Sequence, residues 1–154
     1  MAEPVIELIA ENIFAAINEI KVVNGFSCDL TAVRPKMIDF SDVTPRDGTV
    51  LIYQEDEDRA ENEGTLTNEW NQTFNIVSLV LQSDKSQTPM DIKINRVRAD
   101  IQKKLMEDDS RGGLAITTIL GPSTIFNAGE GFAGISITII VNYRVSETDP
   151  YTRI

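Results

Sequence analysis

The segment from Gly131 to Val145 is the clearest strand in the chain, and it constrains the fold more than any other feature. Its apolar residues alternate with polar ones and are Phe132, Ile135, Ile137, Ile139, Val141, Tyr143 and Val145. A strand with one apolar face needs neighbouring strands and a covering layer to bury that face. The apolar register shifts by one residue near Gly134, so we expect a β-bulge there.

Two other segments carry apolar residues at a spacing of three and four, which is typical of an amphipathic helix. The stripe of the first, over residues 3–23, consists of Ile6, Ile9, Ile13, Ile17 and Ile20. The stripe of the second consists of Met90, Ile94, Val97, Ile101 and Leu105. We expect Asn24-Gly25 to end the first helix, Thr88 to cap the second, and Gly112-Gly113 to end it.

Further strands are expected around these helices. They cover residues 27–39, where Pro35 bends the strand or confines it to an edge, and residues 49–53, 67–82 and 114–120. Gly121-Pro122 is expected to break the last of these. The order of elements predicts an α+β fold, with a mainly antiparallel β-sheet and two helices packed on one face, as a single domain over residues 1–154.

Two segments are expected to lie outside this framework. Residues 55–63 are too polar and self-repelling to bury, so we expect a mobile, exposed acidic loop at about residues 55–66. Its acidic residues are Glu55, Asp56, Glu57, Asp58, Glu61 and Glu63. The C-terminal tail, residues 146–154, is expected either to fray or to dock on a neighbouring subunit and bury Tyr151.

The composition argues against several classes of function. The chain has 24 acidic and 14 basic residues and a formal charge of −10, which disfavours binding to nucleic acid phosphates. It contains no histidine, the commonest general base and metal ligand, and its one cysteine, Cys28, has no partner for an intramolecular disulfide. There is no signal peptide and no apolar run of the roughly 20 residues that cross a bilayer, so we expect a cytoplasmic protein.

Two motifs suggest ligands but lack the required context. The segment from Gly129 to Gly134 has the glycine spacing of a dinucleotide-binding fingerprint, but it leads into a strand rather than a helix, so we expect a turn. A calcium-binding EF-hand loop starting at Asp56 would need glycine where Glu61 stands. A weak divalent site in the acidic loop stays open; we expect no catalytic residue, no cofactor and no specific metal site.

Taken in order, these features resemble the tail terminator, or minor tail protein, family of long-tailed bacteriophages. The resemblance covers nearly the whole chain and depends on order and spacing rather than on one motif. It rests on the amphipathic first helix, the long strand through Trp70 and Phe74, and three further segments. These are Val50-Leu51-Ile52-Tyr53 before the polar loop, Asp100-Ile101-Gln102-Lys103-Lys104-Leu105 before Gly112-Gly113, and Ile139-Ile140-Val141-Asn142-Tyr143-Arg144 followed by Asp149-Pro150-Tyr151.

This resemblance implies a non-enzymatic structural protein of the virion tail that assembles in the cytoplasm of the host bacterium. Its copies would form a hexameric ring that caps the tail tube, stops tube polymerisation and presents a surface to the head or neck. The implied partners are other copies of the chain, the tail tube protein and a neck or head-completion protein, while DNA passes through the lumen without specific binding. We expect the acidic loop to face the lumen or the tube, and the subunit interface to include Tyr143, Arg144, Asp149 and Tyr151.

Three alternatives stay open at this point. Another head-tail connector or neck subunit would also assemble as a small ring. A small-ligand-binding or enzymatic α+β domain would need a pocket with converging polar groups. An acidic mimic of DNA would fit the charge, but not the concentration of so many acidic residues in one segment.

Overall fold

The computed structural model describes residues 2–60, 66–83 and 85–154. Its elements are α1 (Val5–Asn18), a 3₁₀ helix η1 (Val22–Asn24), β1 (Thr31–Val33), β2 (Thr49–Arg59), β3 (Thr67–Leu81), α2 (Met90–Met106), β4 (Thr117–Gly129), β5 (Phe132–Ser146) and β6 (Asp149–Arg153). Two helices with a mixed, mostly antiparallel sheet confirm the predicted α+β fold.

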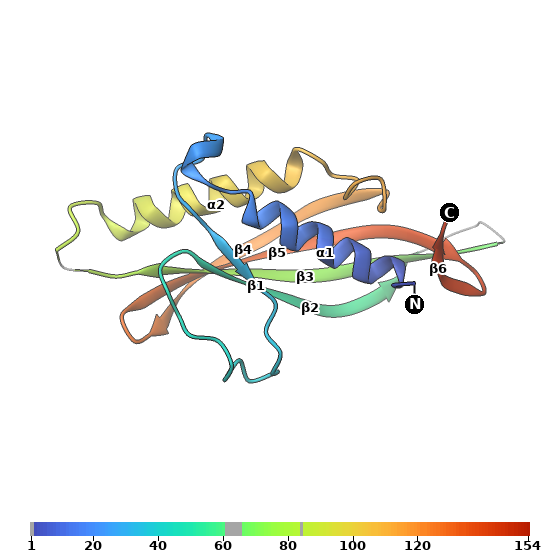
Figure 1. Ribbon diagram of the computed structural model, residues 1–154, viewed down its shortest axis with the longest axis horizontal. Coiled ribbons are helices and arrows are strands. Elements are labelled where there is room, and N and C mark those ends of the chain that lie inside the picture. The colour runs from blue at the N-terminus through green and yellow to red at the C-terminus, as the bar shows by residue number, and fades with distance from the viewer. Residues whose placement is uncertain (1, 61–65, 84) are drawn as a thin grey trace.

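The sheet has the strand order β1-β2-β3-β5-β4, and β6 pairs with the end of β5 (Figure 1). Every pair is antiparallel except β1 with β2, which run in the same direction. The long central strands β3 and β5 pair without interruption from Thr67 opposite Ser146 to Leu81 opposite Phe132. The two edges of the sheet are therefore β1 on one side and β4 on the other.

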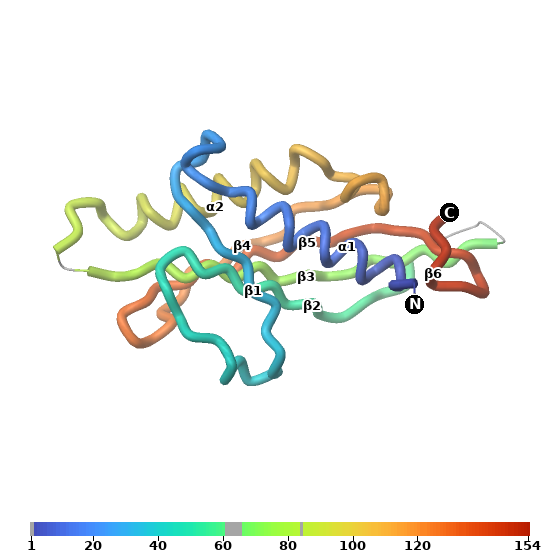
Figure 2. Tube along the Cα trace, in the orientation of Figure 1, coloured from blue at the N-terminus to red at the C-terminus, as the bar shows by residue number. Residues whose placement is uncertain are grey.

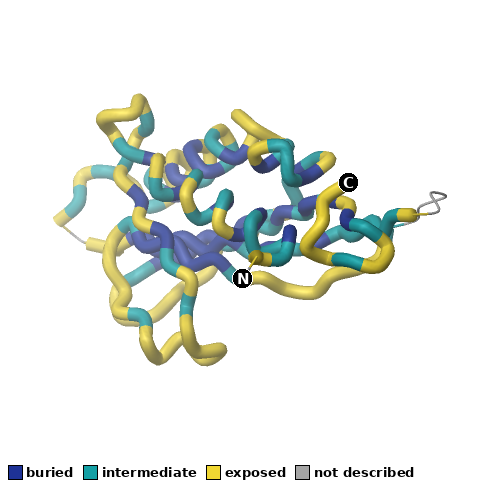
Figure 3. Tube along the Cα trace, turned by 45° about the vertical axis from the view of Figure 1, so that its right-hand side comes forward, coloured by how far each residue is buried: buried dark blue, intermediate teal, exposed yellow. Residues whose placement is uncertain are grey.

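Both helices lie on the same face of the sheet, as the sequence predicts (Figure 1). α1 packs over β1 and β2, whereas α2 packs over β3, β4 and β5 and also contacts α1. The fully buried side chains between the layers include Ile9, Ile13, Ile17, Ile101, Leu105, Phe74, Ile76, Ile135 and Ile137. Figure 3 shows this buried layer between the helices and the sheet. Burial of these apolar side chains is the main stabilising contribution to the fold.

The helix boundaries differ from the predicted ones at three points. α1 ends at Asn18, and the chain then forms the separate turn η1 before Gly25, which has a φ of 91°. Pro89 itself occupies the N-cap position of α2, and no side chain caps that end, so the expected cap by Thr88 is wrong. α2 ends at Met106, before the expected Gly112-Gly113, and Arg111 folds back to donate hydrogen bonds to the carbonyl oxygens of Leu105 and Asp108.

The expected bulge near Gly134 is also wrong. β5 keeps one register with β3 through Gly134, and Phe132 lies on the opposite face from the buried residues that follow it. The irregularities are in β4, between Leu120 and Ser123 and between Asn127 and Gly129. Gly121-Pro122 therefore distorts β4 without ending it.

Three segments outside the central sheet differ from the expectation. Within residues 27–39 only β1 forms a strand, at the edge, and the chain after Val33 runs irregularly to Gly48. Residues 55–59, expected in a loop, continue β2, while residues 61–65 of the same segment lie outside the described residues. The C-terminal tail is not a free end, because β6 pairs back onto β5 of the same chain; docking of Tyr151 on a neighbouring subunit stays a prediction.

Candidate functional site

The β1 edge of the sheet is short and closed. β1 has three residues, and the side chain of Asn18 in α1 reaches its backbone. The Oδ1 atom of Asn18 accepts a hydrogen bond of 2.9 Å from the Ala32 N–H. A short strand with its backbone donor already engaged is a poor template for pairing with another chain.

The β4 edge is long and open by comparison. None of the thirteen residues of β4 is charged. Ile119, Ile125 and Phe126 are 51%, 55% and 37% exposed. Ile125 pairs with the buried Ile135, so it lies on the helix side of the sheet, whereas Ile119 and Phe126 lie on the opposite side. Natural proteins protect exposed edges with charges, proline, bulges or a covering segment. β4 carries Pro122 and two irregularities but no charge, and its exposed apolar side chains make it a candidate contact surface.

One property of this edge, its lack of charged residues, is visible in the sequence. The absence of charge from Thr117 to Gly129 can be read directly from the residues. The sequence does not say that this strand lies at the edge, because strand order depends on long-range pairing. The open edge is thus a functional feature that sequence reasoning missed.

The face of the sheet opposite the helices is largely polar and uncharged at its centre. Ser136 donates a hydrogen bond to Asn75, and the Asn142 Nδ2 atom donates one of 2.9 Å to Asn71 Oδ1. These pairs join β3 to β5 across the open face. At the start of β3, Glu69 Oε2 lies 3.2 Å from the Arg144 Nη2 atom.

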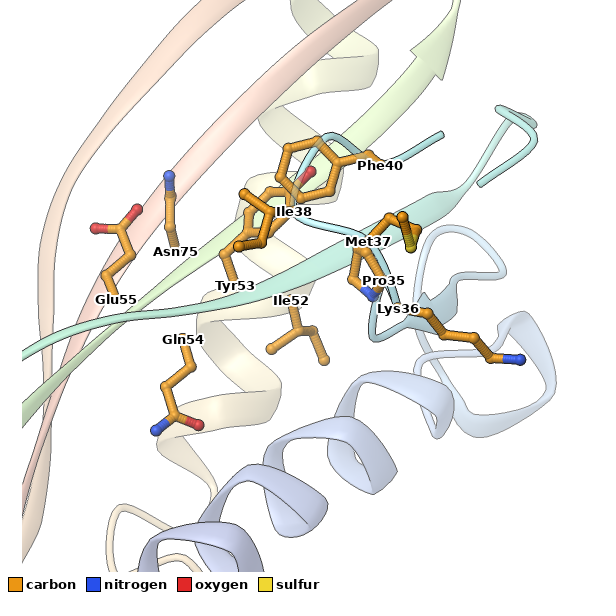
Figure 4. Close-up of a pocket in the computed structure, with 10 residues that line it drawn as sticks. All are labelled: Pro35, Lys36, Met37, Ile38, Phe40, Ile52, Tyr53, Gln54, Glu55 and Asn75. Atoms are coloured by element: carbon orange, nitrogen blue, oxygen red, sulfur yellow. The ribbon is translucent and has the colours of Figure 1, made fainter. Parts of the chain in front are cut away.

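The irregular segment of residues 34–48 covers part of this open face beside β2. The rings of Phe40 and Tyr53 lie 4.4 Å apart between their centroids. They line a groove of about 530 Å³, in which Lys36 extends away from the aromatic pair (Figure 4). Met37 and Ile38 line the same groove and are 52% and 96% exposed. The β1–β2 side of the molecule therefore also presents apolar side chains to solvent.

The acidic end of β2 is exposed, as expected, but it is held in a strand. The register of β2 against β3 shifts between Gln54 and Glu57. At this shift the buried Gln72 side chain donates hydrogen bonds to the carbonyl oxygens of Glu55, at 2.6 Å, and Asp56, at 3.3 Å. Asp58 then pairs with Asn71. The predicted residues Glu61 and Glu63 lie outside the described part of the chain.

The predicted interface residues do not form one surface. Tyr143 is 4% exposed and packs in the core, where its hydroxyl donates a hydrogen bond to Glu57. Arg144 is exposed on the opposite face of the sheet. Asp149 accepts hydrogen bonds from the Thr152 hydroxyl and the Tyr151 N–H, which lower the pKa of its carboxyl group. Tyr151 is 48% exposed, so it is the only aromatic residue of this set with surface available to a partner.

Among the described residues, no group of three or more His, Cys, Asp or Glu side chains is placed to hold a metal ion. Burial raises the pKa of the Cys28 thiol to about 11, and a hydrogen bond to Asp100 adds to the shift. That thiol is protonated at neutral pH and is a poor nucleophile. Asp100 also accepts hydrogen bonds from the Ser27 N–H and hydroxyl, at 3.0 and 2.6 Å, so it serves to tie α2 to the segment before β1.

Within the described ranges, no helix has the length and apolar character to span a membrane. No family model matches this chain, and no curated protein matches it. A proposal about function therefore depends on the surfaces described above and on the resemblance noted in the sequence.

Proposed function

We propose that this chain is a structural, non-enzymatic subunit of a bacteriophage tail. Its copies form a ring that caps the tail tube, stops tube polymerisation and presents a surface to the head or neck. The observation that carries this proposal is the difference between the two edges of the sheet: β4 is long, uncharged and open, whereas β1 is short and closed by Asn18.

This difference favours head-to-tail contacts between copies. Because the β1 edge is short and its Ala32 N–H is engaged, we expect the β4 edge to meet another surface of the neighbouring copy, such as the apolar side chains of the 34–48 segment. A contact between two different surfaces generates a ring when the rotation between subunits closes. A closed ring satisfies its own lateral contacts, and it stops growth if only one of its two faces matches a tube subunit. The number six comes from the resemblance to the tail terminator family.

The partners follow from that arrangement. One face of the ring binds the tail tube protein and the other binds a neck or head-completion protein, and the protein is located in the virion tail after assembly in the host cytoplasm. DNA passes through the lumen without specific binding. The formal charge of −10 supports this part of the proposal, because a strongly acidic protein does not retain phosphates on average.

The test compares the natural chain with a variant of the open edge. Ile119→Lys combined with Ile125→Lys places two charges on β4, and Val23→Lys, at a residue 90% exposed in η1, is the matched control. Native mass spectrometry and negative-stain microscopy follow each protein with and without isolated tail tubes. We expect six-membered rings or capped tubes for the natural chain and for Val23→Lys, and monomers for the β4 variant.

Other outcomes change the conclusion. A two-fold dimer that pairs β4 with β4 would contradict the ring. Rings that bind portal-bearing heads but not tubes would indicate another neck subunit. A strict monomer that ignores tubes under every condition would refute the proposal.

A further inference from the structure

The open β4 edge continues onto one side of α2. The Arg98 Nη1 atom donates a hydrogen bond of 3.5 Å to the Ser123 hydroxyl, which places this side chain at β4. Its Nη2 atom donates one of 2.8 Å to Asn95, and within the described ranges no carboxylate forms a salt bridge with Arg98. Ile125 lies on the same, helix-covered side of the sheet and is 55% exposed. We call Arg98, Ser123 and Ile125 the β4 flank.

The opposite side of the subunit carries a groove between α1 and β1. The groove has a volume of about 590 Å³, and its lining residues are Glu11, Phe14, Ala32, Val33 and Arg34, which we call the α1–β1 groove. Phe14, Ala32 and Val33 form an apolar wall between the two charged residues. A groove of this kind can receive an aliphatic side chain from another molecule.

The α1–β1 groove also offers a carboxylate that the subunit does not pair. Arg34 is taken by Glu7, through contacts of 2.5 and 3.0 Å. That hydrogen bond raises the pKa of Arg34, and the charge of Glu11 adds to the shift. Glu11 is exposed and forms no salt bridge with any described residue. The groove therefore has a free carboxylate, whereas the β4 flank has a cation without a carboxylate partner.

The two surfaces lie at the same level on opposite sides of one sheet. A row of register partners joins the exposed Ile125 to the groove, and its members are Ile125, Ile135, Ser78, Val50 and Ala32. The apolar side chain of the β4 flank is therefore level with the apolar wall of the α1–β1 groove.

The charged groups of the two surfaces are level as well. A second row consists of Ser123, Ile137, Ile76 and Ile52. Ile52 follows Leu51, the register partner of Val33, so this row reaches the β1 side beside Arg34. Arg98 bonds to Ser123 at one end of the row, and Glu11 lines the groove with Arg34 at the other.

A closed ring requires surfaces that are level in this way. Rotation about the ring axis leaves every atom at the same height, so two surfaces that meet in a head-to-tail ring lie at one height on opposite sides of the subunit. When the copies follow one another edge to edge, the rows that cross the sheet run around the ring. In Figure 2, α2 lies above α1 in the view and the chain after β1 descends below both, in keeping with β4 and β1 as opposite edges.

We propose that the β4 flank of one copy docks in the α1–β1 groove of the next, with Ile125 against the apolar wall and Arg98 facing Glu11. This inference rests on the proposed ring and names the surface that the β4 edge meets, which adjoins the 34–48 segment at Arg34. Transfer of Ile125 from water into the groove supplies attraction, and the Arg98–Glu11 pair sets the orientation of the neighbouring copy.

Charge reversal in the full chain tests the ion pair. The flank variant is Arg98→Glu, and its matched control is Arg96→Glu, at an exposed residue about 200° away around the same helix. The groove variant is Glu11→Lys, and its matched control is Glu147→Lys, at an exposed residue after β5. Sedimentation velocity and native mass spectrometry measure self-association at about 0.1 M and about 1 M salt, where the Debye length falls from about 10 to about 3 Å.

We expect the flank and groove variants each to associate about tenfold more weakly than the natural chain at low salt, because like charges then face one another at every contact. The two controls stay close to the natural chain, and high salt reduces the difference. An equal mixture of the two variants recovers association, since an alternating ring pairs opposite charges at every contact. A chain that carries both substitutions recovers it too.

Cross-linking tests the position of Ile125 independently of charge. In a Cys28→Ser background, one variant carries Ile125→Cys, a second carries Val33→Cys and a third carries both. A short bismaleimide should join the two single variants to each other when they are mixed, and should leave each one unlinked alone. The third variant should give a ladder of linked copies that ends at six.

The outcomes separate this inference from the proposed function. If the natural chain forms rings but the reversal variants form them equally well, or the mixture fails to recover, the docking is refuted and the ring stands. If the natural chain forms open chains that the reversals disrupt and the mixture restores, the docking holds and the terminator ring is refuted. Cross-linking of Ile125→Cys to itself would indicate a two-fold contact between β4 edges, and this result, or a chain that stays monomeric with and without tubes, refutes both.

Discussion

The hydroxyl of Tyr143 donates a hydrogen bond to a carboxylate oxygen of Glu57, and this contact joins β5 to the end of β2 across β3. Burial raises the pKa of the Tyr143 hydroxyl, and the hydrogen bond to Glu57 adds to the shift, so the group stays protonated at neutral pH. The buried Tyr143 side chain thus contacts the exposed acidic end of β2 at Glu57.

Replacing Tyr143 with Phe tests this contact. We expect the free energy of unfolding to fall by about 1 kcal/mol, because a hydrogen bond to a charged acceptor is lost while the exposed Glu57 can still be hydrated. Amide hydrogens of residues 55–59 should exchange faster. Denaturant unfolding and hydrogen exchange measure the two effects. Tyr53→Phe is the matched control, since no hydrogen bond of its hydroxyl is found among the described residues; an equal loss there would show that the Tyr143 contact is not special.

Gln72→Met tests the other contact that holds the acidic end of β2. The substitution keeps the volume of this 2% exposed side chain but removes the donor that serves the carbonyl oxygens of Glu55 and Asp56. We expect a loss of about 1–3 kcal/mol in the free energy of unfolding. Gln87→Met, at an exposed position, should change it by less than about 0.5 kcal/mol. A Gln72 variant as stable as the natural chain would show that the β2 irregularity does not need this donor.

Because Glu7 forms an ion pair with Arg34, we expect the free energy of unfolding to depend on pH. The two side chains meet through two contacts of 2.5 and 3.0 Å, and the hydrogen bond from Arg34 lowers the pKa of Glu7 below its ordinary value of 4.5. The pair therefore contributes stability above about pH 4.5, and this contribution is lost as the pH falls through the lowered pKa.

Glu7→Gln should lower the free energy of unfolding at pH 7 by about 0.2–1 kcal/mol, and this loss should shrink as the pH falls below about 4.5 and through the lowered pKa, because the natural side chain then becomes protonated. Thermal unfolding across this pH range measures the difference. Glu3→Gln serves as the control at an exposed residue. An effect of Glu7→Gln that is the same at both ends of the range would contradict the assignment.

We expect substitutions at Gly134 and Phe126, which are neighbours on the open face, to have coupled effects on stability. The two residues are register partners on β5 and β4, and a Cβ atom at position 134 would lie 2.3 Å from the tip of the Phe126 ring. Gly134→Ala should therefore lower the free energy of unfolding by about 1 kcal/mol or more, since the ring must leave its place. In a Phe126→Ala background the same change should be neutral or stabilising, because alanine restricts the unfolded chain more than glycine does. Additive effects in this double-mutant cycle would exclude the coupling.

Much of the fold follows from local patterns. The alternation through residues 135–145 and the helical spacing at Ile9, Ile13 and Ile17 hold in the structure, because each pattern has the period of the element that it forms. The turn at residues 129–131 also follows from local chemistry. Gly129, Glu130 and Gly131 all have positive φ angles, and glycine adopts that conformation at little cost.

Other features needed contacts between distant residues. The acidic end of β2 reads as a loop, since local repulsion disfavours a strand, but pairing with β3 and the Gln72 side chain hold it extended. The pattern predicts Tyr143 on the apolar face of β5, as observed, but not that its hydroxyl would reach a carboxylate two strands away. Residues 146–154 are expected to fray or to dock on a neighbouring subunit, whereas β6 pairs with β5 of the same chain.

The sequence by itself determined the periods, the turns and the charge of each segment, because these depend on residues that are neighbours in the chain. Only the tertiary structure decided that β4 is an open edge, that β1 is closed by Asn18, and that Gln72 and Tyr143 hold the acidic end of β2 in a strand. Strand order depends on which distant segments pair to bury the most apolar surface, and no local pattern specifies that choice.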